Sequence, residues 1–472
     1  MRLAKFGVCA GRCKPNAVQG LRSGAVGSAG LPSCRHRAQP ATQGILGAAP
    51  QLTAALTVSS LTQDLAPLDI GHRLLALTQL LRDHAELWRP LPFVELQAPW
   101  QLRHPELTSW LDGLSDGQLA DPNQRWLEQS PPWLADLAQR ILALSALPWL
   151  ARPPLGALGA VAMRRIPGRK VEQMAGFCAA VLPQMAAEPG ETVDWCSGKG
   201  HLGRTLVRQT GAPLLALELD PELVRVGQQQ CDHLGLRARF ACADVLDPAT
   251  AQWLHPGQWV VALHACGDLH AALLRAAIER QVRGVALAPC CYNRIAAAEG
   301  RALSLLGRAA HLDLTATDLD LIHREPVVAN GTDWQRAQQE QAWRLGFDLL
   351  QRQVTGSPTY RTMPNFPRPW LRLGFGDFCR SFAALDDLQL PPSLDLAPWE
   401  QLGWQRLAQV RRLELVRGLF RPAVEAWLVL DRAQLLVEAG FQVQVGQFCA
   451  RTASPRNALI VAERPGGRDR QS

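Results

Sequence analysis

The sequence lacks two features that would direct it into a membrane or out of the cell. It has no apolar run of the roughly 20 residues that span a bilayer, although 47% of its 472 residues are hydrophobic. It also has no hydrophobic signal-peptide segment. Twelve cysteines in a chain of this length do not make a disulfide scaffold. We therefore expect a globular protein of the reducing cytoplasm, with no membrane partner and with two or three domains.

Acidic residues are absent from the first 50 positions, which contain seven Lys or Arg. This segment accounts for the whole net charge of +7, so residues 51–472 are balanced and any nucleic-acid binding must depend on a local patch. We expect residues 1–50 to be a disordered basic tail, with an organelle transit peptide as the alternative. The cysteines of this segment lack the paired spacing of zinc motifs, so we assign no metal there.

A short apolar run, an acidic residue and three glycines follow one another within residues 192–203. Gly198, Gly200 and Gly203 have the spacing of the dinucleotide-binding fingerprint between a strand and a helix, a weak signal when it stands alone. Asp194, at the end of the strand, discriminates between cofactors. A carboxylate repels the pyrophosphate of a dinucleotide but attracts the ammonium and sulfonium groups of S-adenosylmethionine. We therefore predict a site for S-adenosylmethionine.

Four further apolar runs follow at 214–218, 238–242, 259–263 and 284–288, with helical patterns between them. Strands that alternate with helices predict an α/β fold with a parallel sheet, whose ligands bind at the carboxyl ends of the strands. Acidic residues follow the second and third strands, where they suit the ribose hydroxyls and the adenine amino group; a helix cap is the alternative for each acid alone. The predicted cofactor-binding residues are Asp194, Cys196, Gly198, Gly200, Glu218, Asp244 and His264.

Three segments resemble the methyltransferase domain of a known family: Val193–Gly203, His264–Asp268 and Pro289–Tyr292. The family comprises the methyltransferase-like 25 proteins, the glutathione S-transferase C-terminal-domain-containing protein and the acceptor-stem tRNA 2′-O-methyltransferase. The resemblance extends to Leu430–Arg432 and Ser454–Asn457. It implies a Rossmann-like seven-stranded methyltransferase sheet and S-adenosylmethionine as cofactor, with RNA as the substrate of one branch.

The carboxyl ends of the fourth and fifth strands carry the candidate catalytic residues. His264 and Asp268 are the candidates for a general base. Pro289–Tyr292 occupies the place of the tetrapeptide of amino-group methyltransferases, so we expect Tyr292 to stack on a flat acceptor and Pro289, Cys290 and Cys291 to line its pocket. The Asn or Asp that usually begins this tetrapeptide is missing, which puts amino-group chemistry in doubt.

Cysteine and histidine residues gather at the same strand ends, where they could converge on a metal ion. We favour the alternative, in which small thiols pack around a cofactor pocket, and assign no metal. The residues concerned are Cys196, His201, His264, Cys266, Cys290 and Cys291.

Four basic residues precede the helix that leads into the first strand: Arg164, Arg165, Arg169 and Lys170. Near the cofactor mouth they would bind a substrate phosphate or an acidic target; a solvated charge cluster is the alternative.

The domain organisation follows from composition. We expect a tail (1–50), a helical N-terminal region (51–160), the methyltransferase domain in two parts (161–295 and 405–466) and a large insertion after the fifth strand (296–404). The helical region contains six tryptophans, which we expect to be packing anchors. In the insertion, arginines alternate with aromatic residues between Tyr360 and Arg372, a pattern that suits either nucleic-acid stacking or burial of arginine stems.

These observations predict an S-adenosylmethionine-dependent methyltransferase that acts on RNA, either tRNA or rRNA. A protein side-chain methyltransferase and a non-catalytic binding protein with the same fold are the alternatives. We expect no DNA partner, and the oligomeric state is left open.

Overall fold

The computed structural model describes residues 69–119, 124–150, 168–187, 189–296, 298–323 and 331–465. The basic segment 1–50 and the predicted substrate contacts Arg164 and Arg165 lie outside the described residues. Within these ranges, no helix is both long enough and apolar enough to cross a membrane.

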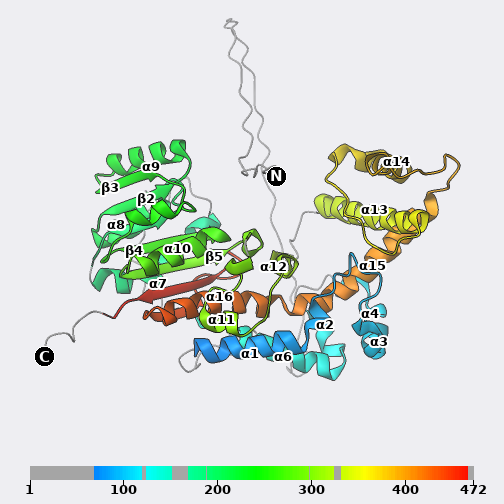
Figure 1. The fold of residues 1–472 in the computed structure, drawn as a ribbon, viewed down its shortest axis with the longest axis horizontal. Coiled ribbons are helices and arrows are strands. Elements are labelled where there is room, and N and C mark those ends of the chain that lie inside the picture. Colours follow the sequence, from blue (N-terminus) through cyan, green and yellow to red (C-terminus); the bar gives the residue numbers. More distant parts are fainter. Residues whose placement is uncertain are drawn as a thin grey trace, which may run out of the picture. The chain divides into compact units, whose positions relative to one another are not determined.

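A seven-stranded sheet in the order β3-β2-β1-β4-β5-β7-β6 organises the fold (Figure 1). Strands β1 to β5 are parallel, and β7 is antiparallel to both β5 and β6. This confirms the predicted seven-stranded α/β fold. The strands are β1 (Thr192–Trp195), β2 (Leu214–Glu218), β3 (Ala238–Cys242), β4 (Trp259–Cys266), β5 (Gly284–Cys290), β6 (Gln442–Gln447) and β7 (Ala458–Glu463).

Helices cover both faces of the sheet because successive strand residues point to opposite sides. Val260 and Ala262 of β4 belong to the apolar core that includes α10 (Asp268–Glu279) and α16 (Arg421–Glu438). Trp259 and Val261 belong to the core on the other face, with α7 (Gly168–Ala187) and α8 (His201–Thr210). Helix α9 (Pro221–His233) packs against β3 and β2, and η3 (Pro248–Trp253) precedes β4.

The N-terminal helices share one core with the sheet instead of forming a core of their own. Helices α1 and α6 pack on α16, and their buried leucines join the apolar cluster that reaches β1 and β5. Of the six tryptophans expected to be packing anchors, Trp88, Trp100 and Trp126 are buried, Trp110 and Trp133 are half-buried, and Trp149 is exposed. The elements are α1 (Ile70–Asp83), α2 (Ala85–Trp88), α3 (Trp100–Arg103), α4 (Pro105–Asp112), α5 (Asp116–Leu119), η2 (Arg125–Gln129) and α6 (Pro132–Ser145).

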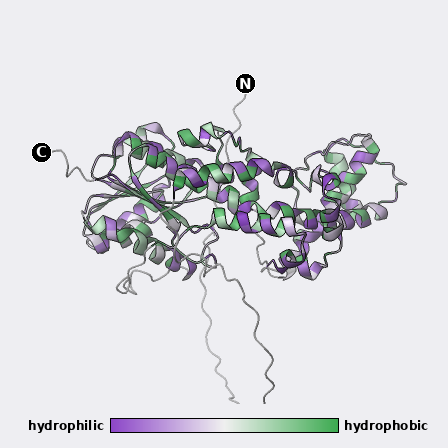
Figure 2. Ribbon diagram, turned by 90° about the horizontal axis from the view of Figure 1, so that it is seen from below, coloured by the Kyte–Doolittle hydropathy of each residue, from purple (hydrophilic) through white to green (hydrophobic). Residues whose placement is uncertain are grey.

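Within the described ranges, all regular elements of the insertion between β5 and α16 are helices, joined by loops. The long helices α13 and α15 pack together, with Gly346 and Gly403 at their closest approach, and η6 and α14 complete the subdomain. Hydrophilic and hydrophobic residues are interspersed along the helices in Figure 2. The elements are η4 (Tyr292–Arg294), η5 (Ala298–Gly300), α11 (Leu305–Ala309), α12 (Ala316–His323), α13 (Gly331–Thr355), η6 (Arg368–Arg372), α14 (Phe375–Leu385) and α15 (Ala397–Leu419).

The aromatic residues of the insertion contribute to its core, which favours the alternative in which they pack with arginine stems. Phe366 and Trp370 are partly buried and lie against Phe382, with ring centroids 5.3 and 5.5 Å away. Arg344 lies over the Phe366 ring, 4.9 Å from its centroid.

Candidate functional site

The glycine loop joins β1 to α8 as the sequence predicts. Gly198 and Gly200 have φ of +59° and +69°, a backbone region that favours glycine. A Cβ atom on Gly200 would lie 2.5 Å from Phe240 Cζ, so the loop has no room for a side chain there. A Cβ atom on Gly198 would meet nothing within 4 Å, so the loop backbone there is open to the close approach of a ligand, which glycine-rich turns of this kind allow.

Asp194 lies under this loop and is 3% exposed. Its Oδ2 accepts a hydrogen bond of 2.9 Å from the backbone N–H of Gly203 in the first turn of α8. Burial raises the pKa of the carboxyl to about 7, and the hydrogen bond from Gly203 and the charge of Arg204 oppose part of this rise. Asp194 is thus a buried carboxylate, and a cation beside it would stabilise its ionised form.

Glu218, at the end of β2, also binds the loop. Its Oε2 accepts from Gly198 N at 2.8 Å, and its Oε1 accepts from Leu219 N and Asp220 N at 3.0 Å. Asp244 follows β3, is exposed, and accepts from Leu246 N at 2.9 Å. Both carboxylates lie at the predicted edge of the sheet. Their predicted contacts with ribose and adenine stay predictions.

Three non-glycine residues at the carboxyl ends of β1, β4 and β5 have left-handed backbones. Cys196, His264 and Cys291 have φ of +57°, +65° and +47°. Such conformations cost about 1–2 kcal/mol for an L-residue and gather at functional sites. At His264 the backbone change coincides with a shift of register between β4 and β5. Sequence reasoning could not have found this signal.

His264 is held by a residue that the sequence analysis missed. Its Nε2 lies 2.9 Å from Oε1 of Gln173 in α7, and Gln173 Nε2 donates to Ala453 O at 2.6 Å. If the ring donates to Gln173, its Nδ1 is the nitrogen that can accept a proton. Burial lowers the pKa of His264, which favours the neutral ring. The predicted roles of His264 as base and cofactor contact are untested.

Asp268 and Tyr292 make contacts that stabilise the fold. Asp268 begins α10 and its Oδ2 accepts from Ala296 N at 3.0 Å, which fixes the chain that follows β5. Tyr292 is fully buried, with the His270 ring 5.6 Å away and the Arg432 guanidinium 5.8 Å from its ring centroid. Pro289 is buried in β5. A ring that is packed inside the core cannot stack on an acceptor, so this structure does not support the role predicted for Tyr292.

The Leu430–Arg432 motif supplies the buried charges next to Tyr292. Arg432 and Asp431 form an ion pair of 2.9 Å, and both side chains are 0% exposed. Arg432 also donates to Gly300 O at 2.6 Å, and Asp431 accepts from Leu303 N at 2.7 Å. The motif therefore anchors the chain after β5 to α16.

Of the six cysteines and histidines considered as metal ligands, the structure brings three thiols together. The sulfur atoms of Cys266, Cys290 and Cys291 all lie within 4.8 Å of one another. Hydrogen bonds from Cys266 and Cys290 lower the pKa of the Cys291 thiol. His201 instead faces Arg204, with 3.0 Å between Nδ1 and Nη2.

Basic side chains border the predicted donor site. Arg169 and Lys170 lie exposed in the first turn of α7, and Lys199 lies exposed in the glycine loop. The positive charge of Lys170 slightly lowers the pKa of both Asp194 and His264. Arg294, also exposed, lies near Cys291. We call Arg169, Lys170, Lys199 and Arg294 the basic rim.

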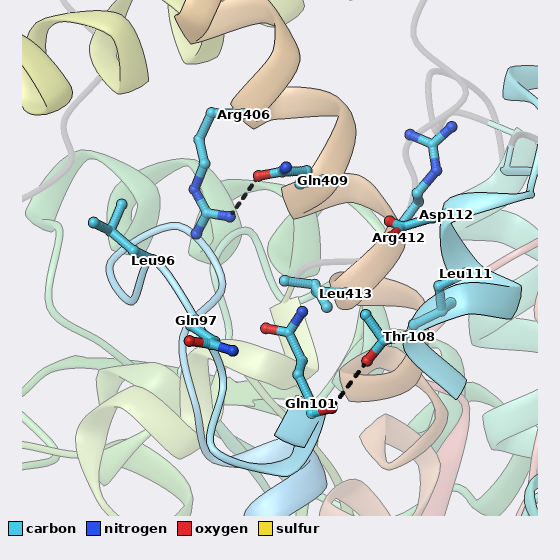
Figure 3. Close-up of a pocket in the computed structure, with 10 residues that line it drawn as sticks. All are labelled: Leu96, Gln97, Gln101, Thr108, Leu111, Asp112, Arg406, Gln409, Arg412 and Leu413. Carbon is cyan, nitrogen blue, oxygen red and sulfur yellow. Dashed lines mark hydrogen bonds between the residues drawn. The ribbon is translucent and has the colours of Figure 1, made fainter. Parts of the chain in front are cut away.

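A separate pocket lies between the N-terminal helices and α15 (Figure 3). Its volume is about 360 Å³. Its two arginines hold loops in place: Arg406 donates to Pro92 O at 2.6 Å and Arg412 donates to Leu114 O at 2.7 Å. Its lining residues are Leu96, Gln97, Gln101, Thr108, Leu111, Asp112, Arg406, Gln409, Arg412 and Leu413, none of which belongs to the glycine loop or to the strand ends.

Comparisons with known proteins show a similarity to methyltransferase domains. A family model described as a methyltransferase domain matches residues 168–298. The glutathione S-transferase C-terminal domain-containing protein of Xenopus laevis is 32% identical over 111 residues, which make up 23% of this chain and 17% of that protein. The match thus spans less than a fifth of that relative.

Two of the solved structures to which the chain is similar are methyltransferases. A TehB-like SAM-dependent methyltransferase from Corynebacterium glutamicum is 18% identical with a TM-score of 0.20, over 24% of this chain and 61% of that chain. A S-adenosylmethionine-dependent methyltransferase from Clostridium acetobutylicum is 15% identical with a TM-score of 0.20, over 26% of this chain and 51% of that chain.

The matched residues 168–298 run from the first turn of α7 to η5 and include β1 to β5. They therefore contain the glycine loop, the buried Asp194 and the three left-handed strand ends. Over residues 168–298, the chain therefore contains a methyltransferase domain.

Proposed function

We propose that this protein is an enzyme that transfers the methyl group of S-adenosylmethionine to RNA. The observation that carries the proposal is the basic rim around a site with a buried carboxylate. The carboxylate of Asp194 suits the cationic donor, whereas Lys170 and Lys199 at the opening suit an anionic acceptor. A polyanion gains from several such side chains at once, and this favours RNA over a neutral small molecule.

Methyl transfer to a bound nucleophile needs an in-line approach to the sulfonium carbon. The protein's contribution is then mainly proximity and orientation of donor and acceptor. A hydroxyl acceptor also needs a base, and we propose His264 for this role. The contact between its Nε2 and Gln173 supports the proposal, because a ring that donates there can accept a proton at Nδ1. The unpaired cysteines of the described ranges suit a reducing compartment, so we propose that the enzyme acts in the cytoplasm.

The substrate is tested by incubating the purified protein with methyl-labelled S-adenosylmethionine and either total RNA or an RNase-treated protein lysate. We expect label in the RNA and none in the protein. Label in protein alone would instead mean that the enzyme methylates protein side chains and not RNA. Donor binding without label in either fraction would favour the non-catalytic alternative.

Removing charge from the basic rim should weaken RNA binding and leave donor binding intact. For Lys170→Ala and Lys199→Ala we expect each loss of a phosphate contact to reduce the slope of log K against log salt by about 1. The donor Kd should change little, because neither ammonium attracts a cationic ligand. The measurement is RNA binding at several salt concentrations, alongside calorimetry with the donor.

Arg336→Ala is the matched control, since Arg336 is an exposed cation of α13 in the insertion. It should leave the salt slope unchanged. Equal effects of all three substitutions would mean that RNA binds through general charge and not through the rim.

A further inference from the structure

The thiols of Cys266, Cys290 and Cys291 lie together, but regular strand geometry explains the position of only the first two. Cys266 and Cys290 are partners in the parallel register of β4 and β5, and their sulfur atoms lie 3.4 Å apart. Neighbouring strands place partner side chains on the same face, so this contact needs nothing special.

The position of the third thiol, that of Cys291, departs from regular strand geometry. Cys291 directly follows Cys290, and in a regular strand its side chain would point to the opposite face. Its left-handed backbone, with φ of +47°, coincides with a placement of its sulfur within 4.8 Å of the other two. That conformation costs about 1–2 kcal/mol. Small thiols can pack together without this conformational cost. An ion bound by all three sulfur atoms would offset it.

Access and spacing both suit a bound ion. Cys290 is buried, while Cys266 and Cys291 are partly exposed, so an ion can enter from solvent. Zinc binds thiolates at about 2.3 Å in a tetrahedron, which places sulfur atoms about 3.8 Å apart. The observed separations, between 3.4 Å for one pair and the 4.8 Å limit, need only small side-chain movements to reach this value.

We propose that Cys266, Cys290 and Cys291 bind one Zn²⁺ ion through three thiolates, with the fourth position open to a water molecule or an acceptor atom. Binding forms three Zn–S bonds and breaks three S–H bonds, and the three protons pass to solvent. Three protein ligands and one exchangeable position are typical of zinc sites that take part in chemistry, whereas closed structural sites have four. The site lies at the carboxyl ends of β4 and β5, beside the strand β1 that carries the donor loop.

The proposal is tested on the full-length protein, reduced and reconstituted with ZnCl₂ without oxygen and then desalted. Elemental analysis should give about one zinc per chain. Substitution by Co²⁺ should give the intense sulfur-to-cobalt charge-transfer absorption of a thiolate site. Absence of zinc after reconstitution, together with absence of that absorption, would overturn the proposal.

Variants separate ligands from neighbouring groups. Cys266→Ser, Cys290→Ser and Cys291→Ser should each lower the zinc content several-fold. Cys242→Ser, an exposed cysteine outside the cluster, should keep the full content. His323→Ala should also keep it; His323 ends α12, which packs against η4, and its Nε2 is buried without a hydrogen-bond partner in the described ranges. Loss of zinc in His323→Ala would contradict the open fourth position.

The cobalt spectrum shows whether a cysteine is a ligand even if its serine variant is less stable than the wild type. Cys291→Ser should still give a spectrum with two thiolates, reduced in intensity, when the protein remains folded by circular dichroism. A wild-type spectrum in that variant would exclude Cys291 as a ligand. The metal content does not depend on methyl transfer to RNA, so failure of this proposal and failure of the proposed function are distinguishable.

Discussion

Asp431→Ala should lower the free energy of unfolding by about 3–5 kcal/mol, because it breaks a buried ion pair and leaves one charge without its partner. Asp431 accepts from Leu303 N at 2.7 Å, from Ser304 N at 3.0 Å and from Ser304 Oγ at 2.7 Å, in addition to its 2.9 Å contact with Arg432. Urea unfolding followed by circular dichroism measures the change.

Glu438→Ala is the matched control, since Glu438 lies on the same helix and holds the same chain segment. It accepts from Leu305 N at 2.7 Å and Leu306 N at 3.0 Å, but it is exposed. Water can replace these contacts, so we expect a loss of about 1 kcal/mol or less. The double variant Asp431→Ala/Arg432→Leu should recover part of the loss. A small effect of Asp431→Ala would mean that the motif does not anchor the insertion.

Asp194→Asn should weaken the binding of S-adenosylmethionine roughly 10- to 100-fold, the effect of removing a hydrogen bond or contact to a charged group. The amide oxygen of asparagine can still accept from Gly203 N, which Asp194 contacts at 2.9 Å. The variant should therefore fold normally. Isothermal titration calorimetry gives the donor Kd, and thermal unfolding is the control for the fold. Unchanged affinity in the folded variant would remove Asp194 from the donor site.

The same carboxyl predicts how donor binding depends on pH. Its pKa is raised from an ordinary 3.8 to about 7 in the donor-free protein. Below pH 7 the donor must therefore displace a proton, and its apparent affinity should fall about tenfold for each pH unit. This dependence should be absent in Asp194→Asn.

The stability of the donor-free protein follows the opposite trend. A folded pKa above the unfolded value means that the folded state binds the proton more tightly. The contribution of Asp194 to stability is thus fully present below about pH 4 and is lost as the pH rises through 7. Relative to the wild type, Asp194→Asn should gain stability as the pH rises across this interval. A flat difference in Tm between the two proteins would contradict the raised pKa.

Much of the sheet could be predicted because its signals are local. Leu214–Glu218 and Ala238–Cys242 are strands with the predicted bounds, since each is a short apolar run that ends at a turn and is followed by a helical pattern. The glycine spacing likewise placed the loop between β1 and α8.

The parts of the site that were missed depend on tertiary contacts. The direction in which Tyr292 turns is set by the core around His270 and Arg432, which no local pattern encodes. Gln173 is 91 positions from His264 in the sequence, yet fixes its ring. The left-handed backbone of Cys291 has no signature in the sequence either. The strand ends could therefore be found from the sequence, but the arrangement of side chains on them could not.

The central claim is that the carboxyl ends of these strands bind a cationic methyl donor and not a dinucleotide. Isothermal titration calorimetry of the wild-type protein with S-adenosylmethionine, its demethylated product and NAD tests it most directly. We expect micromolar-range binding of the first two and no binding of NAD, because Asp194 would repel the pyrophosphate. Preferential binding of NAD would contradict the assignment of the site.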